Sequence, residues 1–304
     1  MKKTIILMAI SLFMLSGINA QTKQLTIKKG TNLSTIDGKG DDEQWQDVDP
    51  VAIDTPFGNE NASVKAWFKM YYTDDYLYVY VDVTDDVHIP VWVGKADNEK
   101  VKDVHQFYDK VEIYFDVNDN LKDGNGPAYI GTEGGGGTIA PGHYQFAPWF
   151  EEDGYDSPFL MSGLLFGSMS DQAMVCYSLR EDYSGYGVEF ELPLKKFLND
   201  KGEYLSKEAF ENLPQGLGFD VTVVDNDADD LGRKRVVWCS SEQEAYYNMD
   251  GCGIVRFGQS SGIENLKTDT GHAKTGICYN LLGMRVDRNK KGIIICDGKK
   301  IINK

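Results

Sequence analysis

Four segments in the middle of this 304-residue chain alternate apolar and polar residues with a period of two. Because successive side chains of a β-strand point to opposite faces, each segment predicts a strand with one face in a core. The apolar positions are Leu77, Val79, Val81 and Val83; Val111, Ile113 and Phe115; Val188, Phe190 and Leu192; and Phe219, Val221 and Val223. Many short strands with Gly, Asp and Asn turns indicate an all-β fold, an antiparallel β-sandwich. Only two short helices are expected, at residues 195–198 and 206–213.

The outward faces of these strands carry aromatic and acidic residues. Tyr76, Tyr78 and Tyr80 share one face, which is either a flat binding platform or a surface packed under the second sheet. We favour packing, and we also interpret Trp45 and Trp238 as core residues.

The net charge of −16 limits the partners of the chain. A strongly negative field repels phosphate backbones and anionic membrane surfaces, so we expect no nucleic-acid partner. It suits neutral ligands and divalent cations, although solubility alone is an equally simple explanation for it.

The first twenty residues resemble a cleavable export signal. Lys2 and Lys3 precede the apolar run of residues 4–15, and small residues follow up to Ala20. We predict a signal peptide at residues 1–20 and a mature chain that starts at Gln21. The run is too short to span a membrane comfortably, and no later stretch predicts a transmembrane span.

Five cysteines in an exported chain allow disulfide bonds. The possible pairs are Cys239 with Cys252 and Cys278 with Cys296, which leaves Cys176 over. The alternative is that these side chains are free and buried.

An ordered set of short motifs spans residues 35–257. The motifs are IDGK at 36–39, DEQW at 42–45, DYLYV at 75–79, VTD at 83–85, DKVEIYFD at 109–116, GVEF at 187–190, LGFDV at 217–221, DND at 225–227 and GIV at 253–255. Together they resemble family 9 carbohydrate-binding modules. The resemblance implies a DOMON-like β-sandwich at residues 21–257 that binds a glycan. It also implies structural calcium and a partner glycoside hydrolase, because many such modules accompany these enzymes.

The resemblance also suggests where a sugar binds. The family holds a sugar between two tryptophans, and the matching segments of this chain carry Phe107 and Tyr108 in one place and Tyr246 and Tyr247 in the other. Aromatic rings of this kind can stack on a sugar. The alternative for each is packing within its own loop.

Polar partners for a sugar follow from the same resemblance. Glu112 matches a site glutamate and points away from the core by alternation, Arg233 or Arg235 matches an arginine, and Gln243 lies where the family has an asparagine. The simpler interpretations are a solvated strand face for Glu112 and charge balance for the arginines. Ala147 stands where the family has another arginine, so the set is incomplete.

Two acidic loops are candidate calcium sites, since calcium prefers six to eight oxygen ligands. The candidate ligands are Asp116, Asn118 and Asn120 in the first loop and Asp225, Asp227 and Asp229 in the second. Neither loop has the EF-hand pattern, and solvated acidic turns are the alternative.

The C-terminal residues form a separate expectation. Residues 258–272 are polar and predict a linker, and residues 273–304 contain YNLLGMRV, KGIII and GKK. These motifs resemble a type IX secretion sorting domain. That implies passage across the outer membrane of a Gram-negative bacterium, followed by release or attachment to the cell surface. The alternative is a small structural β unit.

We therefore predict an exported, non-catalytic carbohydrate-binding protein that supports polysaccharide catabolism. One alternative is a glycoside hydrolase with paired carboxylates, which 47 acidic residues do not exclude. The other is a surface interaction protein that has lost sugar binding. No histidine pair has metal-ligand spacing and no nucleophile motif is present, so catalysis has little support in the sequence.

Overall fold

The computed structural model describes residues 22–88, 107–128, 142–148, 173–182, 184–227 and 232–258. It also describes the short strand segments 155–156, 160–161, 278–280, 285–286, 292–296 and 299–303. The chain forms two compact units, residues 1–260 and residues 261–304. In the described part of the chain, no helix combines the length and apolarity needed to cross a bilayer. The predicted signal peptide and most of the predicted linker lie outside the described residues.

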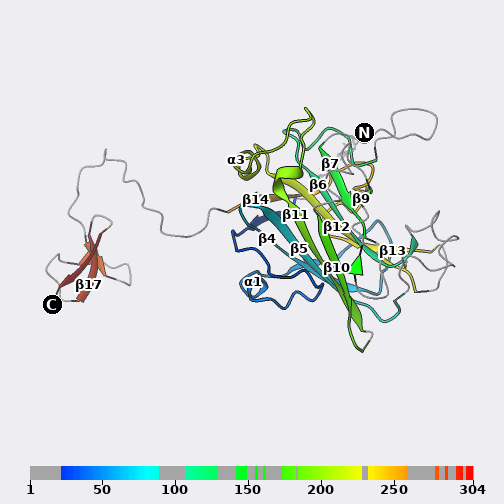
Figure 1. Cartoon of the computed structure of the whole chain (residues 1–304), viewed down its shortest axis with the longest axis horizontal. Helices are drawn as coiled ribbons and strands as arrows, with labels where there is room; N and C mark the ends of the chain where they lie inside the picture. The colour runs from blue at the N-terminus through cyan, green and yellow to red at the C-terminus, as the bar shows by residue number, and fades with distance from the viewer. Residues whose placement is uncertain are drawn as a thin grey trace, which may run out of the picture. The chain divides into compact units, whose positions relative to one another are not determined.

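The first unit contains two facing sheets (Figure 1). The larger sheet has the strand order β1-β14-β12-β6-β7-β9, with β13 paired to β12 and β3 paired to β13. Its strands are β1 (Gln24–Ile27), β3 (Thr55–Pro56), β6 (Lys110–Asp116), β7 (His143–Phe146), β9 (Leu160–Met161), β12 (Leu217–Asp225), β13 (Lys234–Val237) and β14 (Gly253–Phe257).

The second sheet has the order β2-β4-β5-β11-β10-β8. Its strands are β2 (Val51–Ile53), β4 (Lys65–Tyr72), β5 (Tyr76–Thr84), β8 (Tyr155–Asp156), β10 (Met174–Leu179) and β11 (Gly185–Pro193). The strand pairs of both sheets are antiparallel except β1 with β14, which is parallel. The prediction of a β-sandwich is confirmed, and β1 makes the larger sheet mixed.

The core lies between the two sheets and uses the predicted apolar faces. All four alternating segments form strands, and their inward side chains are fully buried. Phe68 of β4 packs against Phe219 and Trp238 at ring-centroid distances of 5.3 and 5.4 Å, which joins the sheets. Burying a large aromatic side chain contributes about 3 kcal/mol, so this cluster is a major source of stability.

The outer face of the second sheet is covered by residues 33–48, which include helix α1 (Glu43–Gln46). Trp45 packs against Tyr71 and Tyr80 at 4.9 and 5.9 Å, and Tyr78 is fully buried below it. Packing is therefore confirmed for these tyrosines, and a flat platform is not formed. The expectation that the second sheet covers them was wrong, because the cover comes from the N-terminal segment.

A buried carboxylate fixes this covering segment to β11. Glu189 accepts hydrogen bonds from the amides of Asp37 and Gly38 at 2.9 and 3.1 Å, and from the Trp45 indole at 2.6 Å. Gly38 has a φ of +78°, and a Cβ there would lie 2.7 Å from the Ser178 nitrogen. Only glycine allows the backbone to approach the sheet this closely.

The two helix predictions are confirmed in shortened form. The 3-10 helix η3 spans Leu194–Lys196, and α3 spans Lys207–Glu211. Ser206 caps α3, since its hydroxyl accepts a hydrogen bond from the Ala209 amide at 3.1 Å.

The structure forms no disulfide bond between Cys239 and Cys252, so the possible pairing of these two residues is not formed and the alternative of free thiols holds for them. Cys252 is buried and Cys239 is partly buried, and Cys176 is also buried. The side chains of Cys278 and Cys296 lie outside the described residues. Their backbones are opposite one another in the register of the second unit.

The second unit is a four-stranded sheet in the order β16-β15-β17-β18. Its strands are β15 (Cys278–Asn280), β16 (Arg285–Val286), β17 (Gly292–Cys296) and β18 (Lys299–Asn303). Its predicted role as a sorting domain stays a prediction.

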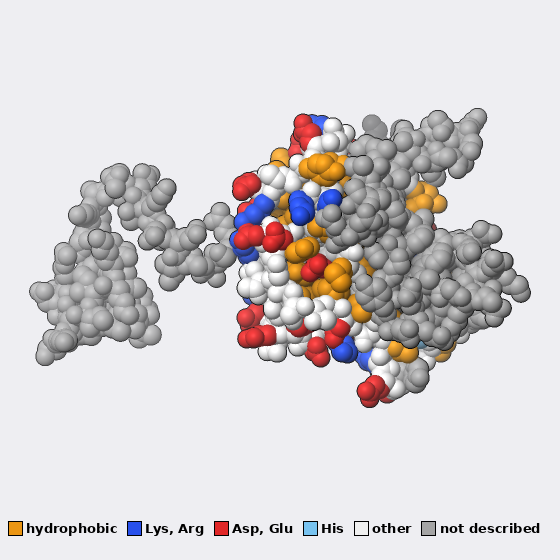
Figure 2. All heavy atoms as spheres, viewed as in Figure 1, with side chains coloured by type: hydrophobic (Ala, Val, Ile, Leu, Met, Phe, Trp, Pro, Cys, Tyr) orange, Lys and Arg blue, Asp and Glu red, His pale blue; other side chains and the backbone are white. Residues whose placement is uncertain are grey.

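Charges are mixed on the surface of the described residues in Figure 2. Acidic and basic side chains lie interspersed among polar and apolar ones on the face shown.

Candidate functional site

A cavity of about 380 Å³ lies on the outer face of the larger sheet. We call it the Glu112 cavity. It is lined by Phe57, Phe107, Lys110, Glu112, Tyr114, Gln145, Thr222, Arg233, Arg235, Ser240, Glu244, Ala245, Tyr246 and Tyr247. A concave site with aromatic side chains and a few fixed polar groups is typical of small-ligand binding.

The floor of the cavity comes from neighbouring strands in register. Lys110, Glu112 and Tyr114 occupy alternate positions of β6, so they share its outward face. The pairing places Thr222 of β12 opposite Glu112, and Gln145 of β7 opposite Tyr114. Sheet geometry alone therefore assembles this row of polar groups.

A chain of short hydrogen bonds fixes the floor. Glu112 pairs with the Lys110 ammonium at 2.6 Å and accepts a hydrogen bond from the Tyr114 hydroxyl at 2.5 Å. The Gln145 amide in turn donates to the Tyr114 hydroxyl at 3.0 Å. Burial favours the neutral acid, but Lys110 and the hydrogen bonds outweigh it and lower the pKa of Glu112. The group is therefore an ionised hydrogen-bond acceptor.

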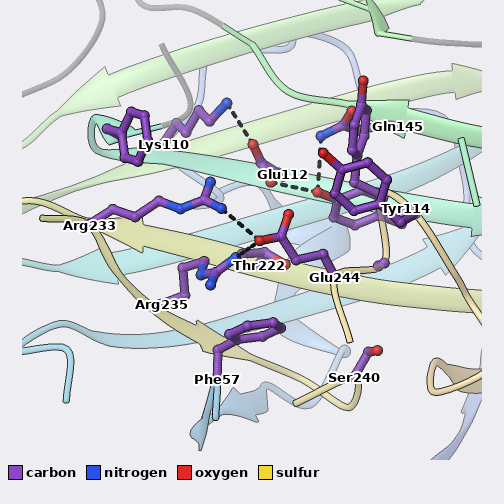
Figure 3. Close-up of a pocket in the computed structure, with 14 residues that line it drawn as sticks. Phe57, Lys110, Glu112, Tyr114, Gln145, Thr222, Arg233, Arg235, Ser240 and Glu244 are labelled. Atoms are coloured by element: carbon purple, nitrogen blue, oxygen red, sulfur yellow. Dashed lines mark hydrogen bonds and ion pairs between the residues drawn. The ribbon is translucent and has the colours of Figure 1, made fainter. Parts of the chain in front are cut away.

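Two arginines form one wall of the cavity. Arg233 and Arg235 both contact one oxygen of Glu244, at 2.8 and 2.6 Å (Figure 3). The other edge of Arg235 forms a two-point ion pair with Glu60 at 2.6 and 3.0 Å, and its guanidinium lies 3.7 Å from the Phe57 ring centroid. These contacts hold the planar guanidinium groups rigidly.

The charges in the cavity are nearly balanced. Lys110, Arg233 and Arg235 are opposed by Glu112 and Glu244, and Glu60 pairs with Arg235 from the side. Such a set presents many donors and acceptors without a large net field. It therefore suits a neutral polyhydroxylated ligand better than a strongly charged one.

Tyr246 and Tyr247 form the aromatic rim. Their ring centroids are 4.9 Å apart at an interplanar angle of 73°, so they present two surfaces of different orientation. Tyr246 packs beside Tyr114, Ala245 and Met249, whereas Tyr247 is 45% exposed. Tyr247 is thus the ring that a ligand can cover most easily.

The loop that carries this rim is fastened to the strand below by Asp220. The carboxylate accepts hydrogen bonds from the amides of Val221, Cys239 and Ser240 at 2.8, 3.0 and 2.6 Å. Burial raises the pKa of Asp220 to about 6, although the three amides favour the ionised form.

This pKa predicts a pH dependence. Well below about pH 4 the acid is protonated in both the folded and the unfolded state, and well above about pH 6 it is ionised in both. The folded state binds the extra proton between these values, so this group lowers the free energy of unfolding as pH rises through that window. The loss is about 3 kcal/mol. The stability advantage of the wild type over Asp220→Asn should therefore shrink between about pH 4 and about pH 7 in urea unfolding. A difference that stays constant or widens with pH would contradict this assignment.

The structure brings together most of the predicted sugar-binding residues. Phe107, Glu112, Arg233, Tyr246 and Tyr247 all line the cavity. Tyr108 and Gln243 are not among the lining residues. The Gln243 carbonyl accepts a hydrogen bond from the Ser240 hydroxyl at 2.7 Å, and its neighbour Glu244 faces the cavity instead. The binding role of each residue stays a prediction.

Several lining residues were missed. Lys110 and Tyr114 lie two positions from Glu112 on the same strand, so the alternation that oriented Glu112 contains the signal for both. Phe57 and Glu244 come from segments far away in sequence, and no local pattern in the chain identifies them.

Candidate ligand side chains in both calcium loops form hydrogen bonds or ion pairs within the protein. Asp116 accepts from the Asn118 amide at 3.0 Å, and Asn120 accepts from the Lys122 amide at 3.2 Å. Asp225 accepts from the Ser63 amide at 2.6 Å, and Asp227 pairs with Lys234 at 2.9 Å. Asp229 lies outside the described residues. Calcium binding at these loops stays a prediction.

Comparisons with known proteins agree with this fold. Residues 36–129 match the sequence model of the family described as carbohydrate family 9 binding domain-like. The chain is similar to the exoglucanase XynX of Acetivibrio thermocellus, with 28% identity over 232 residues, which are 75% of this chain and 17% of that protein. It therefore spans only about a sixth of the length of this curated relative.

Two solved structures have the same fold. Both are a family 9 carbohydrate-binding module from Caldicellulosiruptor kristjanssonii, one in complex with cellotriose and one in complex with glucose. The first has a TM-score of 0.52 at 17% identity and covers 80% of this chain and 98% of the module. The second has a TM-score of 0.53 at 18% identity and covers 81% and 100%. At these identities the likeness establishes the β-sandwich fold alone.

Proposed function

From the match of residues 36–129 to the family 9 carbohydrate-binding model, we propose that this chain is a non-catalytic carbohydrate-binding protein. The Glu112 cavity is its sugar site. The observation that carries the proposal is the pairing of an aromatic rim with a rigid, charge-balanced row of donors and acceptors in one cavity. Sugars have apolar ring faces and many hydroxyls, so they need both kinds of contact.

In this proposal, each part of the cavity has a separate task. Tyr247 covers a face of the sugar ring, while Glu112 and Glu244 accept hydrogen bonds from hydroxyls. Lys110, Arg233 and Arg235 donate to hydroxyl and ring oxygens. Because these groups already hold one another in place, little side-chain entropy is lost on binding.

The contacts of the two cavity carboxylates favour binding over hydrolysis. A glycosidase needs one carboxylic acid that stays protonated near neutral pH. Glu112 has a lowered pKa beside Lys110, and Glu244 accepts from two arginines. Both groups are thus set up as acceptors. Release of chromophore from aryl glycosides by the pure protein would favour the alternative of a glycoside hydrolase.

Calorimetric titration with cellotriose and glucose, followed by a glycan array, tests the site. We expect saturable binding by the wild type and about 5- to 30-fold weaker binding by Tyr247→Ala, because a stacking ring contributes about 1–2 kcal/mol. Tyr204→Ala is the matched control, since Tyr204 is 57% exposed and is not among the cavity-lining residues.

The outcomes distinguish the hypotheses. If Tyr247→Ala and Tyr204→Ala lost sugar binding equally, the Glu112 cavity would not be the sugar site. No binding of any glycan by the folded wild type would favour the remaining alternative, a surface interaction protein that has lost sugar binding.

The same proposal includes export and partnership. The basic and apolar start of the chain supports a signal peptide at residues 1–20, and the motifs of residues 273–304 support type IX secretion to the cell surface or medium. There the protein would bind glycan in support of a partner glycoside hydrolase. Deletion of residues 273–304 should keep the protein inside the cell envelope, which cell fractionation measures.

A further inference from the structure

Three side chains meet where β5 ends and β6 begins, and none of them is among the residues that line the Glu112 cavity. Asp85 directly follows β5, Asp109 directly precedes β6, and His88 lies three residues after Asp85. One ligand atom of each lies within 4.8 Å of the others. Because β5 and β6 belong to different sheets, this group connects the two layers of the sandwich. We call it the Asp85 cluster.

The spacing within the cluster is that of ligands around one ion. His88 Nδ1 lies 3.4 Å from Asp109 Oδ2 and 3.8 Å from Asp85 Oδ2. Both distances exceed the usual range of N–H···O hydrogen bonds. Two atoms bound at about 2.0–2.1 Å to one tetrahedral ion lie about 3.4 Å apart. A metal ion between the three atoms therefore fits with little movement.

Each member is held so that one atom points into the cluster. Asp85 Oδ1 accepts from the Val87 amide at 3.1 Å, and Asp109 Oδ1 accepts from the Asn226 amide at 2.6 Å. His88 Nε2 lies 2.6 Å from the Tyr177 hydroxyl. These contacts leave both Oδ2 atoms and Nδ1 directed at one another. Hydrogen bonds of this kind orient the ligands of protein metal sites.

The charge of the cluster calls for a cation. Asp85 and Asp109 are 3% and 0% exposed, and Asp225 at the end of β12 is also fully buried. Asp85 Oδ2 and Asp225 Oδ1 accept no hydrogen bond from the residues that the structure describes. A buried carboxylate oxygen that accepts no hydrogen bond is costly unless a cation neutralises its charge.

We infer that Asp85, His88 and Asp109 bind a divalent transition-metal ion that ties the two sheets together, with Asp225 supplying a further nearby carboxylate. The imidazole decides the class of ion. Nitrogen with carboxylate oxygen suits Zn²⁺, whereas Ca²⁺ prefers an oxygen-only shell of six to eight ligands. The three ligands Asp85, His88 and Asp109 are not among the predicted calcium ligands, whereas Asp225 belongs to the second predicted calcium loop. The inference does not depend on sugar binding.

The test uses the full chain without a histidine tag, stripped of metal with a chelator. Calorimetry should show one equivalent of Zn²⁺ bound, with Mn²⁺ weaker, as expected from the general order of affinities. The thermal unfolding temperature should rise by several degrees at saturating Zn²⁺, because an ion bound only by the folded state stabilises it. Co²⁺ should give visible absorption bands without a thiolate charge-transfer band, which excludes the cysteines as ligands.

Variants locate the site. His88→Gln should weaken Zn²⁺ binding at least about 100-fold, and Tyr177→Phe, which removes only the orienting hydroxyl, about tenfold. Asp42→Asn is the control, because Asp42 belongs to a separate acidic group with Asp37 and Glu189. Tyr177→Phe keeps the test valid if His88→Gln does not fold.

Two results would overturn the inference. One is Zn²⁺ binding that is unchanged in both His88→Gln and Tyr177→Phe. The other is a folded, metal-free wild type that binds no equivalent of Zn²⁺, in which case the imidazole carries a proton between the two carboxylates instead.

Discussion

Replacement of Glu112 by alanine is expected to lower the free energy of unfolding by about 3–5 kcal/mol, which is the usual cost of breaking a buried ion pair from one side. Lys110 and Glu112 are 1% and 7% exposed, and their charged atoms are 2.6 Å apart. Without the carboxylate, the buried ammonium loses this partner and the Tyr114 hydroxyl loses its acceptor. Urea unfolding followed by circular dichroism measures the loss.

Two further variants separate the pair from general effects of substitution. Glu203→Ala removes a solvent-exposed carboxylate and should change the free energy of unfolding by less than about 0.5 kcal/mol. The double variant Lys110→Met with Glu112→Leu should recover much of the loss, because replacing both charges by apolar groups leaves neither one buried alone. A double variant as unstable as Glu112→Ala would mean that the ion pair is not the source of the effect.

Replacement of Glu189 by leucine should be equally damaging, at about 3–5 kcal/mol. The carboxylate is fully buried and accepts three hydrogen bonds, and each buried donor left without an acceptor costs about 1–3 kcal/mol. These bonds hold residues 33–48 over the outer face of the second sheet. We therefore expect that segment to detach before the rest of the unit unfolds.

The local character of this effect can be measured separately. Hydrogen exchange at the amides of Asp37 and Gly38 should become faster in Glu189→Leu, and Trp45 fluorescence should shift to longer wavelength as the indole meets water. Glu181→Leu introduces the same side chain at an exposed position and should change neither the hydrogen exchange of Asp37 and Gly38 nor the fluorescence of Trp45. Unchanged exchange at Asp37 in Glu189→Leu would show that the carboxylate does not anchor the segment.

Much of the fold follows from local pattern. The alternation at residues 77–83, 111–115, 188–192 and 219–223 predicted four strands and the face that each one buries, and all four form. The face of a strand to which a side chain points depends only on its position along the chain, so the sequence alone predicts it. The parallel pairing of β1 with β14 has no such local signal, because it depends on where two distant segments meet.

The candidate site was predicted in part for the same reason. Glu112 could be oriented by alternation, and the matching of short motifs pointed to Tyr246 and Arg233. Neither alternation nor motif matching identifies Glu244 or Phe57, because both residues reach the cavity from loops. The path of the loop that carries Glu244 depends on tertiary contacts, such as the hydrogen bonds from Cys239 and Ser240 to Asp220. The motif match placed Gln243 at the site, but the residue that lines the cavity is its neighbour Glu244.

The outward faces of β5 and β6 show most clearly what each level of information decides. Alternation along the chain is enough to predict that Tyr78 and Tyr80 point outward on β5 and that Glu112 points outward on β6. Which of these side chains are covered depends on the packing of distant segments: residues 33–48 bury the tyrosines, while the loop after β13 leaves a cavity over Glu112. The physical reason is that a strand fixes the direction of its own side chains, but what covers them arrives from another part of the chain.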